Sequence, residues 1–348
     1  MKKILIVLLM IQTFFLAAEV LIELQDDIGD DYGDGKVTYP EHTMFTEGLF
    51  DMESFRIEEV GNYYKFVVRI RGKVDYVEYD EFGYKYGIPD DFIFPLVQIY
   101  IDTDHKMNSG LTETINGTNV TIAPESAWER AVVFSSLPQK FRASIQRNQE
   151  VFLPRIAVPD KIKISSDKQE ISVKISKNFL GKIQEDWGFA VMMFCHDVTT
   201  TVKKNNYTME IKASSSLFNF GGGHGTLYFR YNPNVIDMIT PPFQSQKKIL
   251  HDYDVENKTY VVVEAVYPFG SKLRSNETIG EVKQVSEDKV VVDLGTDQGV
   301  EAGTKLIIEN QYIVEVQDVF PGLSIASFTS EDDIYEIKAG MKVRIWQE

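Results

Sequence analysis

An all-β fold is predicted for most of this chain, and three features of the sequence predict it. Tyr, Phe, Val and Ile are abundant, and these aromatic and β-branched residues favour pleated surfaces over helical bundles. Apolar and polar residues alternate in several short runs, which is typical of strands that bury one face. After residue 270 the chain breaks into short β-like runs separated by glycine turns. We therefore expect an antiparallel β-sandwich followed by a small β-barrel.

The first residues have the pattern of a secretory signal peptide. Met1-Lys2-Lys3 precedes an apolar stretch over residues 4–16, and two alanines follow before Glu19. The stretch is shorter than the roughly 18 apolar residues that a membrane-spanning helix needs. We expect residues 1–18 to be removed and the protein to be exported to the periplasm or cell surface of a bacterium, without a transmembrane span after cleavage. An uncleaved anchor is the alternative.

Composition narrows the classes of partner. The formal net charge is −16, so phosphate backbones and anionic lipids are repelled and nucleic acid is not an expected partner. Neutral sugars and calcium ions are compatible with this charge. Cys195 is the single cysteine, so no internal disulfide can form and the fold must be held by buried apolar area.

Alternating runs predict the individual strands of the sandwich. Residues 54–71 read as a hairpin that turns at residues 60–62, with Phe66, Val68 and Ile70 on one face. Further strands are expected at residues 96–102, 131–134, 161–165, 170–175 and 188–194.

Little helix is expected. Residues 177–181 predict a single helical turn closed by glycine, and residues 244–253 predict a short helix that Ser245 caps, with Ile249 and Leu250 facing inward.

A domain boundary is expected near residues 268–276, which divides the chain into a sandwich over residues 19–270 and a barrel over residues 271–348. Closure of a small barrel removes the exposed edges of its strands. The six barrel strands are expected at residues 279–285, 289–294, 305–309, 312–319, 323–328 and 342–346.

A glycine-rich loop over residues 26–35 crowds five carboxylates together. Ca²⁺ takes six to eight oxygen ligands from carboxylates and backbone carbonyls in flexible loops, although the spacing here does not match an EF-hand. Asp51 and Asp102-Thr103-Asp104 are expected to converge on the same sheet end as this loop. A solvated acidic turn is the alternative to a metal site. The predicted ligands of a structural Ca²⁺ are Asp26, Asp30, Asp31 and Asp51.

The loop over residues 76–92 is rich in aromatic rings and carboxylates. Sugars stack their C–H faces on such rings while carboxylates accept their hydroxyl hydrogens. Cover for the sandwich edge is the alternative role. The predicted ligand-binding rings are Tyr76, Tyr79, Phe82, Tyr84, Tyr86 and Phe92.

Three consecutive glycines, Gly221, Gly222 and Gly223, permit backbone angles that are closed to other residues. Because no Lys-Ser/Thr pair follows them, a phosphate cradle is not favoured. We expect a tight turn that lines the ligand groove.

No catalytic constellation is found, and we expect a protein that is not an enzyme. The five histidines lack the HExxH spacing of zinc hydrolases, and no GxSxG nucleophile elbow occurs. Acidic residues are so numerous that a glycosidase pair could be drawn almost anywhere.

Residues 25–255 resemble the C-terminal module of glucodextranase, which also occurs in amylopullulanases and related exported bacterial proteins. The resemblance includes DDIGDDYGDGKVTYP from residue 26, VQIYIDTD from residue 97, FGGGHG from residue 220 and NVIDMITPPFQSQKKILHDYD from residue 234. It implies a DOMON-like β-sandwich that binds carbohydrate or associates with the cell surface without catalysis. The chain departs from the family pattern where a tyrosine-rich loop replaces a tryptophan and where Phe218-Asn219 replaces Trp-Arg.

Residues 277–348 resemble, more loosely, the C-terminal domain of flagellar assembly protein T. The strings are IGEVKQVSEDKVVVDLGTDQGVEAGTKLIIE, EVQDVFPGLSIASF and AGMKVRIW. This resemblance implies a small SH3-like barrel that contacts a protein or the envelope.

Three functions are compatible with these observations. In the first, the sandwich binds a polysaccharide or a glycosylated envelope component and the barrel docks to a protein partner. In the second, the protein is a structural envelope or sheath component that packs against other proteins. In the third, it is a glycoside hydrolase that uses carboxylates of the acidic loops, such as Asp30 or Asp102.

Overall fold

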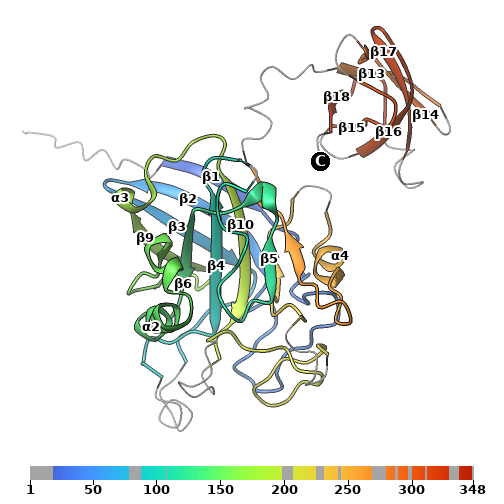
Figure 1. The fold of residues 1–348 in the computed structure, drawn as a ribbon. Helices are drawn as coiled ribbons and strands as arrows, with labels where there is room; N and C mark the ends of the chain where they lie inside the picture. Colours follow the sequence, from blue (N-terminus) through green and yellow to red (C-terminus); the bar gives the residue numbers. More distant parts are fainter. Residues whose placement is uncertain are drawn as a thin grey trace, which may run out of the picture.

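Two five-stranded sheets face each other and form the predicted β-sandwich (Figure 1). This computed structural model describes residues 19–77, 88–106, 108–197, 207–224, 231–241, 244–268, 280–286, 289–296, 300–309, 312–328 and 337–346. The predicted signal peptide, residues 1–18, lies outside these ranges. In the described part of the chain, no helix has the length and apolar character needed to cross a membrane.

The first sheet has the strand order β1-β2-β3-β9-β8, and all its neighbours are antiparallel. The predicted hairpin is confirmed, with β2 and β3 joined at Gly61, whose φ is 58°. Phe66, Val68 and Ile70 are all fully buried, as expected for one inward face. The strands are β1 (Glu19–Gln25), β2 (Met52–Val60), β3 (Tyr63–Ile70), β8 (Lys163–Ile164) and β9 (Glu170–Ser176).

The second sheet has the order β11-β10-β4-β6-β7, with a parallel pair only between β6 and β7. Every residue of β4 and β10 is buried, so this sheet is covered on both faces. Continuous apolar runs are typical of such strands. The strands are β4 (Pro95–Asp102), β6 (Arg130–Phe134), β7 (Ile156–Ala157), β10 (Gly188–Cys195) and β11 (Asp237–Met238).

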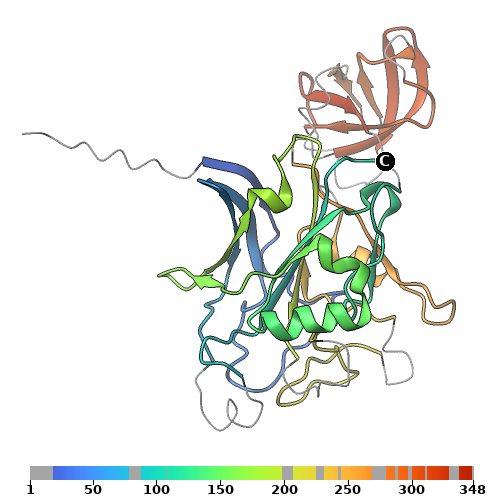
Figure 2. The same ribbon diagram turned by 60° about the vertical axis from the view of Figure 1, so that its left-hand side comes forward.

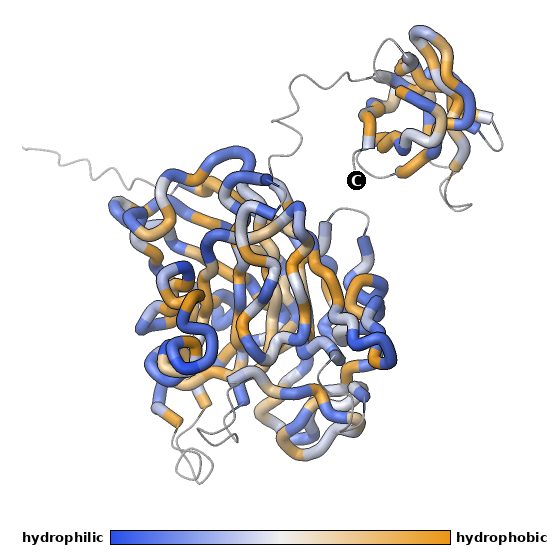
Figure 3. Tube along the Cα trace, viewed as in Figure 1, coloured by the Kyte–Doolittle hydropathy of each residue, from blue (hydrophilic) through white to orange (hydrophobic). Residues whose placement is uncertain are grey.

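One core fills the space between the sheets, and a second lies behind the second sheet. Phe55 of β2 and Phe189 of β10 meet across the first core, with ring centroids 5.8 Å apart. In the second core, the ring of Trp128 packs against Tyr100 and Phe152, each at 5.3 Å. Figure 3 shows the apolar stretches along the sheet strands.

The second core is covered by helices and a small parallel strand pair (Figure 2). The covering elements are β5 (Val120–Ile122), η1 (Pro124–Ser126), α2 (Pro138–Asn148), η2 (Glu150–Arg155), α4 (Gln246–His251) and β12 (Val261–Val263).

Helix α2 corrects the expectation of little further helix. It begins with Pro138 in its first turn and buries Phe141 and Ile145, which are four residues apart. Two apolar positions in eleven residues give a weak periodic signal, which explains why the pattern was missed. The two predicted helices are confirmed. Helix α3 (Lys177–Leu180) is followed by Gly181, and α4 has Ser245 at its N-cap, although the serine hydroxyl makes no capping hydrogen bond.

The C-terminal strands close into the predicted antiparallel barrel, in the order β13-β14-β17-β16-β15-β18. All six predicted strands are confirmed, and Val290, Leu306 and Val343 are among the side chains that fill its interior. The strands are β13 (Gly280–Val285), β14 (Lys289–Val292), β15 (Lys305–Ile308), β16 (Tyr312–Phe320), β17 (Leu323–Phe328) and β18 (Lys342–Ile345).

Candidate functional site

The predicted acidic loop follows β1 and is held against both sheets. The Asp26 N–H donates to the Glu53 carbonyl at 3.1 Å, which attaches the loop to the first sheet. The Gly33 N–H donates to the Ile236 carbonyl at 2.9 Å, beside the second sheet. Gln246 of α4 donates to the Asp30 carbonyl at 2.5 Å. These bonds fix the loop where the two sheets and α4 meet.

Asp30, Asp51 and Asp237 each contribute a carboxylate oxygen to one group, in which these atoms all lie within 4.8 Å of one another. Asp51 and Asp237 are completely buried, and Asp30 is half-buried. Asp237 was not predicted, because it lies far along the chain and only the pairing of β11 with β10 brings it here. The one indication in the sequence is that Asp237 is a single charged residue inside the apolar run Val235–Ile239.

The two buried carboxylates accept hydrogen bonds from the backbone. Asp51 accepts from the Gly29 N–H at 2.9 Å and forms an ion pair with Arg71. Asp237 accepts from the Met52 N–H at 2.6 Å and from the Met238 N–H at 2.9 Å. The Met52 bond links a residue of β2 to a residue of β11, so this carboxylate already joins the two sheets.

Burial and mutual repulsion raise the pKa values of this group. Burial, followed by the charge of Asp30, raises the pKa of Asp26 to about 9. Burial, followed by the charge of Asp27, raises the pKa of Asp30 to about 6. Burial also raises the pKa of Asp237 well above its ordinary value, with Asp26 the next cause. The cluster therefore holds protons at neutral pH when no cation compensates its charge.

The fourth predicted metal residue, Asp31, lies beside this group and is 1% exposed. One of its oxygens accepts from the Tyr39 hydroxyl, which in turn accepts from the Phe50 N–H at 3.3 Å. Its other oxygen is buried without a hydrogen-bond partner. Burial raises the pKa of Asp31, and the charge of Asp51 adds to that effect.

Asp102 and Asp104 do not converge with Asp51, which corrects that expectation. They form a separate group with Glu129, whose carboxylate accepts from the Thr103 N–H at 2.8 Å. Asp102 itself accepts from the Tyr267 hydroxyl at 2.5 Å and from the His105 N–H at 2.7 Å. The two acidic segments therefore define two distinct carboxylate groups.

Of the predicted ligand-binding rings, Tyr76 is 45% exposed and Phe92 is fully buried. The Phe92 ring packs against Phe94 at 5.3 Å and His196 at 5.6 Å, so it belongs to the core. The remaining predicted rings, Tyr79, Phe82, Tyr84 and Tyr86, lie outside the described residues.

The three glycines form the expected tight turn. Gly222 has φ of 96°, and a Cβ atom on it would lie 1.9 Å from the Lys36 carbonyl oxygen. The N–H groups of Gly221, Gly222 and Gly223 all donate to backbone carbonyls, at 2.9, 3.4 and 2.8 Å. These three donors are therefore used within the fold and are not available to an anion.

The glycine turn and the base of the aromatic loop adjoin the same group of rings. Phe92 contacts Phe94, Phe94 contacts Phe45 at 4.5 Å, and Phe45 contacts Phe220 at 6.0 Å. Figures 1 and 2 place both segments at the same end of the sandwich.

A further group of rings, which we call the tyrosine patch, follows the glycine turn and comprises His224, Tyr231, Tyr253 and Tyr260. The rings of Tyr231 and Tyr260 lie 5.1 Å apart, and those of His224 and Tyr253 lie 5.5 Å apart. The Tyr253 hydroxyl donates to the Asn232 amide oxygen at 3.2 Å. Tyr260 is 38% exposed. The patch was missed because its members are isolated in the sequence.

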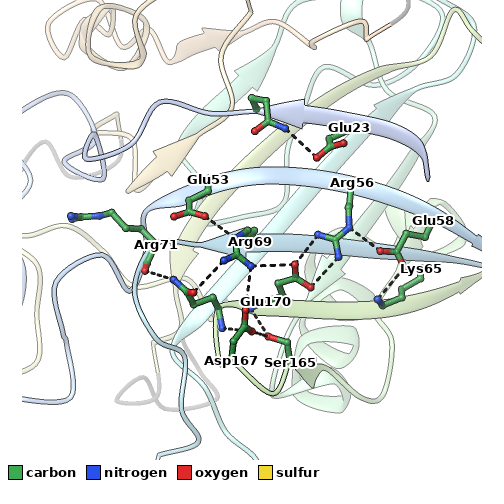
Figure 4. Close-up of polar contacts among 12 residues, drawn as sticks. Glu23, Glu53, Arg56, Glu58, Lys65, Arg69, Arg71, Ser165, Asp167 and Glu170 are labelled. Carbon is green, nitrogen blue, oxygen red and sulfur yellow. Dashed lines mark hydrogen bonds and ion pairs between the residues drawn. The ribbon is translucent and has the colours of Figure 1, made fainter. Parts of the chain in front are cut away.

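The outer face of the first sheet carries a network of paired charged side chains (Figure 4). Arg56 pairs with both oxygens of Glu170 at 2.9 and 3.0 Å and with Glu58 at 2.8 Å. Arg69 extends this network to Glu53 at 2.8 Å. A hollow beside α2 has a volume of about 10 Å³, room for about one water molecule. Neither feature is suited to stacking a sugar.

The described part of the chain forms a β-sandwich module with exposed rings near its loops. A family model described as the C-terminal binding module, SLH-like, of glucodextranase matches residues 21–266. The chain belongs to this family, which is described as a binding module and not as a catalytic domain. No curated protein gives a significant match.

Proposed function

We propose that this protein is an exported, non-catalytic carbohydrate-binding protein. The sandwich holds a polysaccharide or a glycosylated envelope component, and the small barrel docks to a protein partner in the envelope. Membership of the glucodextranase binding-module family supports the binding role. The tyrosine patch is the main observation that supports a carbohydrate ligand, because a binding module needs an accessible surface whose chemistry complements its ligand.

The tyrosine patch combines the two properties that sugar recognition requires. The paired rings of Tyr231 and Tyr260 offer apolar faces on which the C–H face of a sugar stacks. The hydroxyl of Tyr253 donates to the buried amide oxygen of Asn232 and keeps its own oxygen as an acceptor. The exposed imidazole of His224 adds polar nitrogens at the same place, and such groups fix the orientation of a ligand on an apolar floor. No Asp, Glu, Lys or Arg is a member of the patch, which suits a neutral glycan.

Calorimetric titration of soluble α-glucans and wall polysaccharides tests this proposal. Tyr260→Ala removes an exposed ring and is expected to weaken binding about tenfold or more, the usual effect of truncating an aromatic anchor. Tyr63→Ala is the matched control, because Tyr63 is 47% exposed at the start of β3 and should bind normally. Tyr76→Ala tests the aromatic loop as the competing surface. Absence of binding heat with every glycan would remove the carbohydrate assignment.

A structural role in the envelope is the second candidate. Val262 and Leu217 are 53% and 51% exposed, and each offers an apolar side chain to a protein partner. Phe320, at the end of β16 in the barrel, is 49% exposed and is our candidate anchor for a protein partner. Capture of an envelope protein that is insensitive to added glycan would favour this role over the first.

A further inference from the structure

We propose that Asp26, Asp30, Asp51 and Asp237 form a Ca²⁺ site that ties the two sheets of the sandwich together. Asp51 directly precedes β2 of the first sheet, and Asp237 begins β11 of the second. Three of these residues place carboxylate oxygens within 4.8 Å of one another. A single ion bound there contacts both layers, and this cross-link distinguishes the site from a calcium-binding surface loop.

Buried oxygens without partners point to a missing ligand of positive charge. Asp26 Oδ2 and Asp30 Oδ1 are buried and have no hydrogen-bond partner. Asp31 Oδ1 is also unpartnered, on a side chain that is only 1% exposed and is influenced by the charge of Asp51. Such atoms are rare in folded proteins and commonly indicate an unseen ion or water. Within the described part of the chain, Arg71 is the single cationic side chain in contact with the group.

The donor chemistry selects calcium. Every candidate donor is an oxygen. This disfavours zinc and copper, which prefer nitrogen and sulfur ligands. The carboxylates come from a loop, from a residue before β2 and from β11, so their arrangement is irregular. Ca²⁺ accepts irregular sets of six to eight oxygens, whereas Mg²⁺ demands a near-ideal octahedron and retains several waters.

Thermal unfolding of the purified protein in CaCl₂ and in chelator tests the site without any glycan. At a calcium concentration 100 times the Kd, we expect the melting temperature of the sandwich to rise by roughly 5–10 °C. Calorimetric titration with CaCl₂ at pH 7 measures the same binding independently of unfolding.

Asp237→Asn is the decisive variant, since it removes a ligand charge while the amide oxygen still accepts from one of the two backbone N–H groups, that of Met52 or that of Met238. We expect it to weaken calcium binding by at least about 100-fold, more than the loss of an outer-shell partner does. Asp30→Asn, at a half-buried position, is a second variant if the first does not fold. Asp252→Asn, on the exposed Asp252, is the matched control and should respond like the native protein.

Two results would overturn the proposal. The first is an identical melting temperature in calcium and in chelator. The second is a full calcium response in both Asp237→Asn and Asp30→Asn, and loss of the response in Asp102→Asn would then move the site to the other carboxylate group.

Discussion

Replacement of Gly222 by Ala tests whether the glycine turn is needed for the stability of the fold. Gly222 has φ of 96°, a conformation that L side chains rarely adopt, and such backbone strain costs about 1–3 kcal/mol. The new Cβ would also lie 1.9 Å from the Lys36 carbonyl oxygen and 3.0 Å from Val37 Cα. Because these are backbone atoms that cannot swing away, overpacking adds about 1–3 kcal/mol. We expect a total loss of about 2–6 kcal/mol in the free energy of unfolding.

Gly61→Ala is the matched control. Gly61 also has positive φ, 58°, but a Cβ there meets nothing within 4 Å, so only the strain cost of about 1–2 kcal/mol applies. Urea unfolding followed by the fluorescence of the buried Trp128 and Trp187 measures both variants, with equal slopes required for comparison. The structural role of Gly222 would be refuted if both variants lost the same free energy of unfolding, or if Gly222→Ala were as stable as the native protein. Either result would mean that the close approach of its backbone to Lys36 does not constrain the fold.

Two further predictions concern charge. In chelator, the free energy of unfolding should fall as pH rises from about 4 through 6 towards 9, because folded Asp30 and Asp26, with pKa values of about 6 and about 9, keep protons that the unfolded chain has released. Stability that is flat or rising over that range, measured by urea unfolding at each pH, would contradict this. Glu170→Gln should cost about 1–2 kcal/mol at pH 7, because it breaks the paired contact with Arg56. Arg56 lowers the pKa of Glu170, so this loss should disappear as pH falls below 4.5, the ordinary value. Glu47→Gln, at a side chain 81% exposed, should cost little, and an equal loss would argue against the network.

The strands were predictable because their signal is local. In β3 the alternating residues Phe66, Val68 and Ile70 are sufficient to predict one inward face, and a glycine between two such runs predicts the hairpin. The six barrel strands follow from the same reasoning. Helix α2 was missed because its cover of the second sheet rests on two apolar side chains, Phe141 and Ile145, and tertiary packing decides such weak cases.

The candidate site could be predicted only where its residues share a loop. An acidic run in the sequence identifies Asp26, Asp30 and Asp31. Asp237 joins them only through the pairing of β11 with β10. Phe92 is buried and Tyr76 is exposed. The sequence could not distinguish them, because both belong to one aromatic segment. Strand order brings distant residues together, and strand order cannot be predicted from local composition.

Capture of a glycan without its hydrolysis is the property that we propose for this module. Incubation of the protein with insoluble polysaccharides, followed by assay of the supernatant for both protein and newly formed reducing ends, tests it most directly. We expect the protein to be depleted from solution by at least one polysaccharide, to be released by the matching soluble glycan, and to produce no reducing ends. Failure to be depleted by any of them, or steady release of reducing ends, would contradict it.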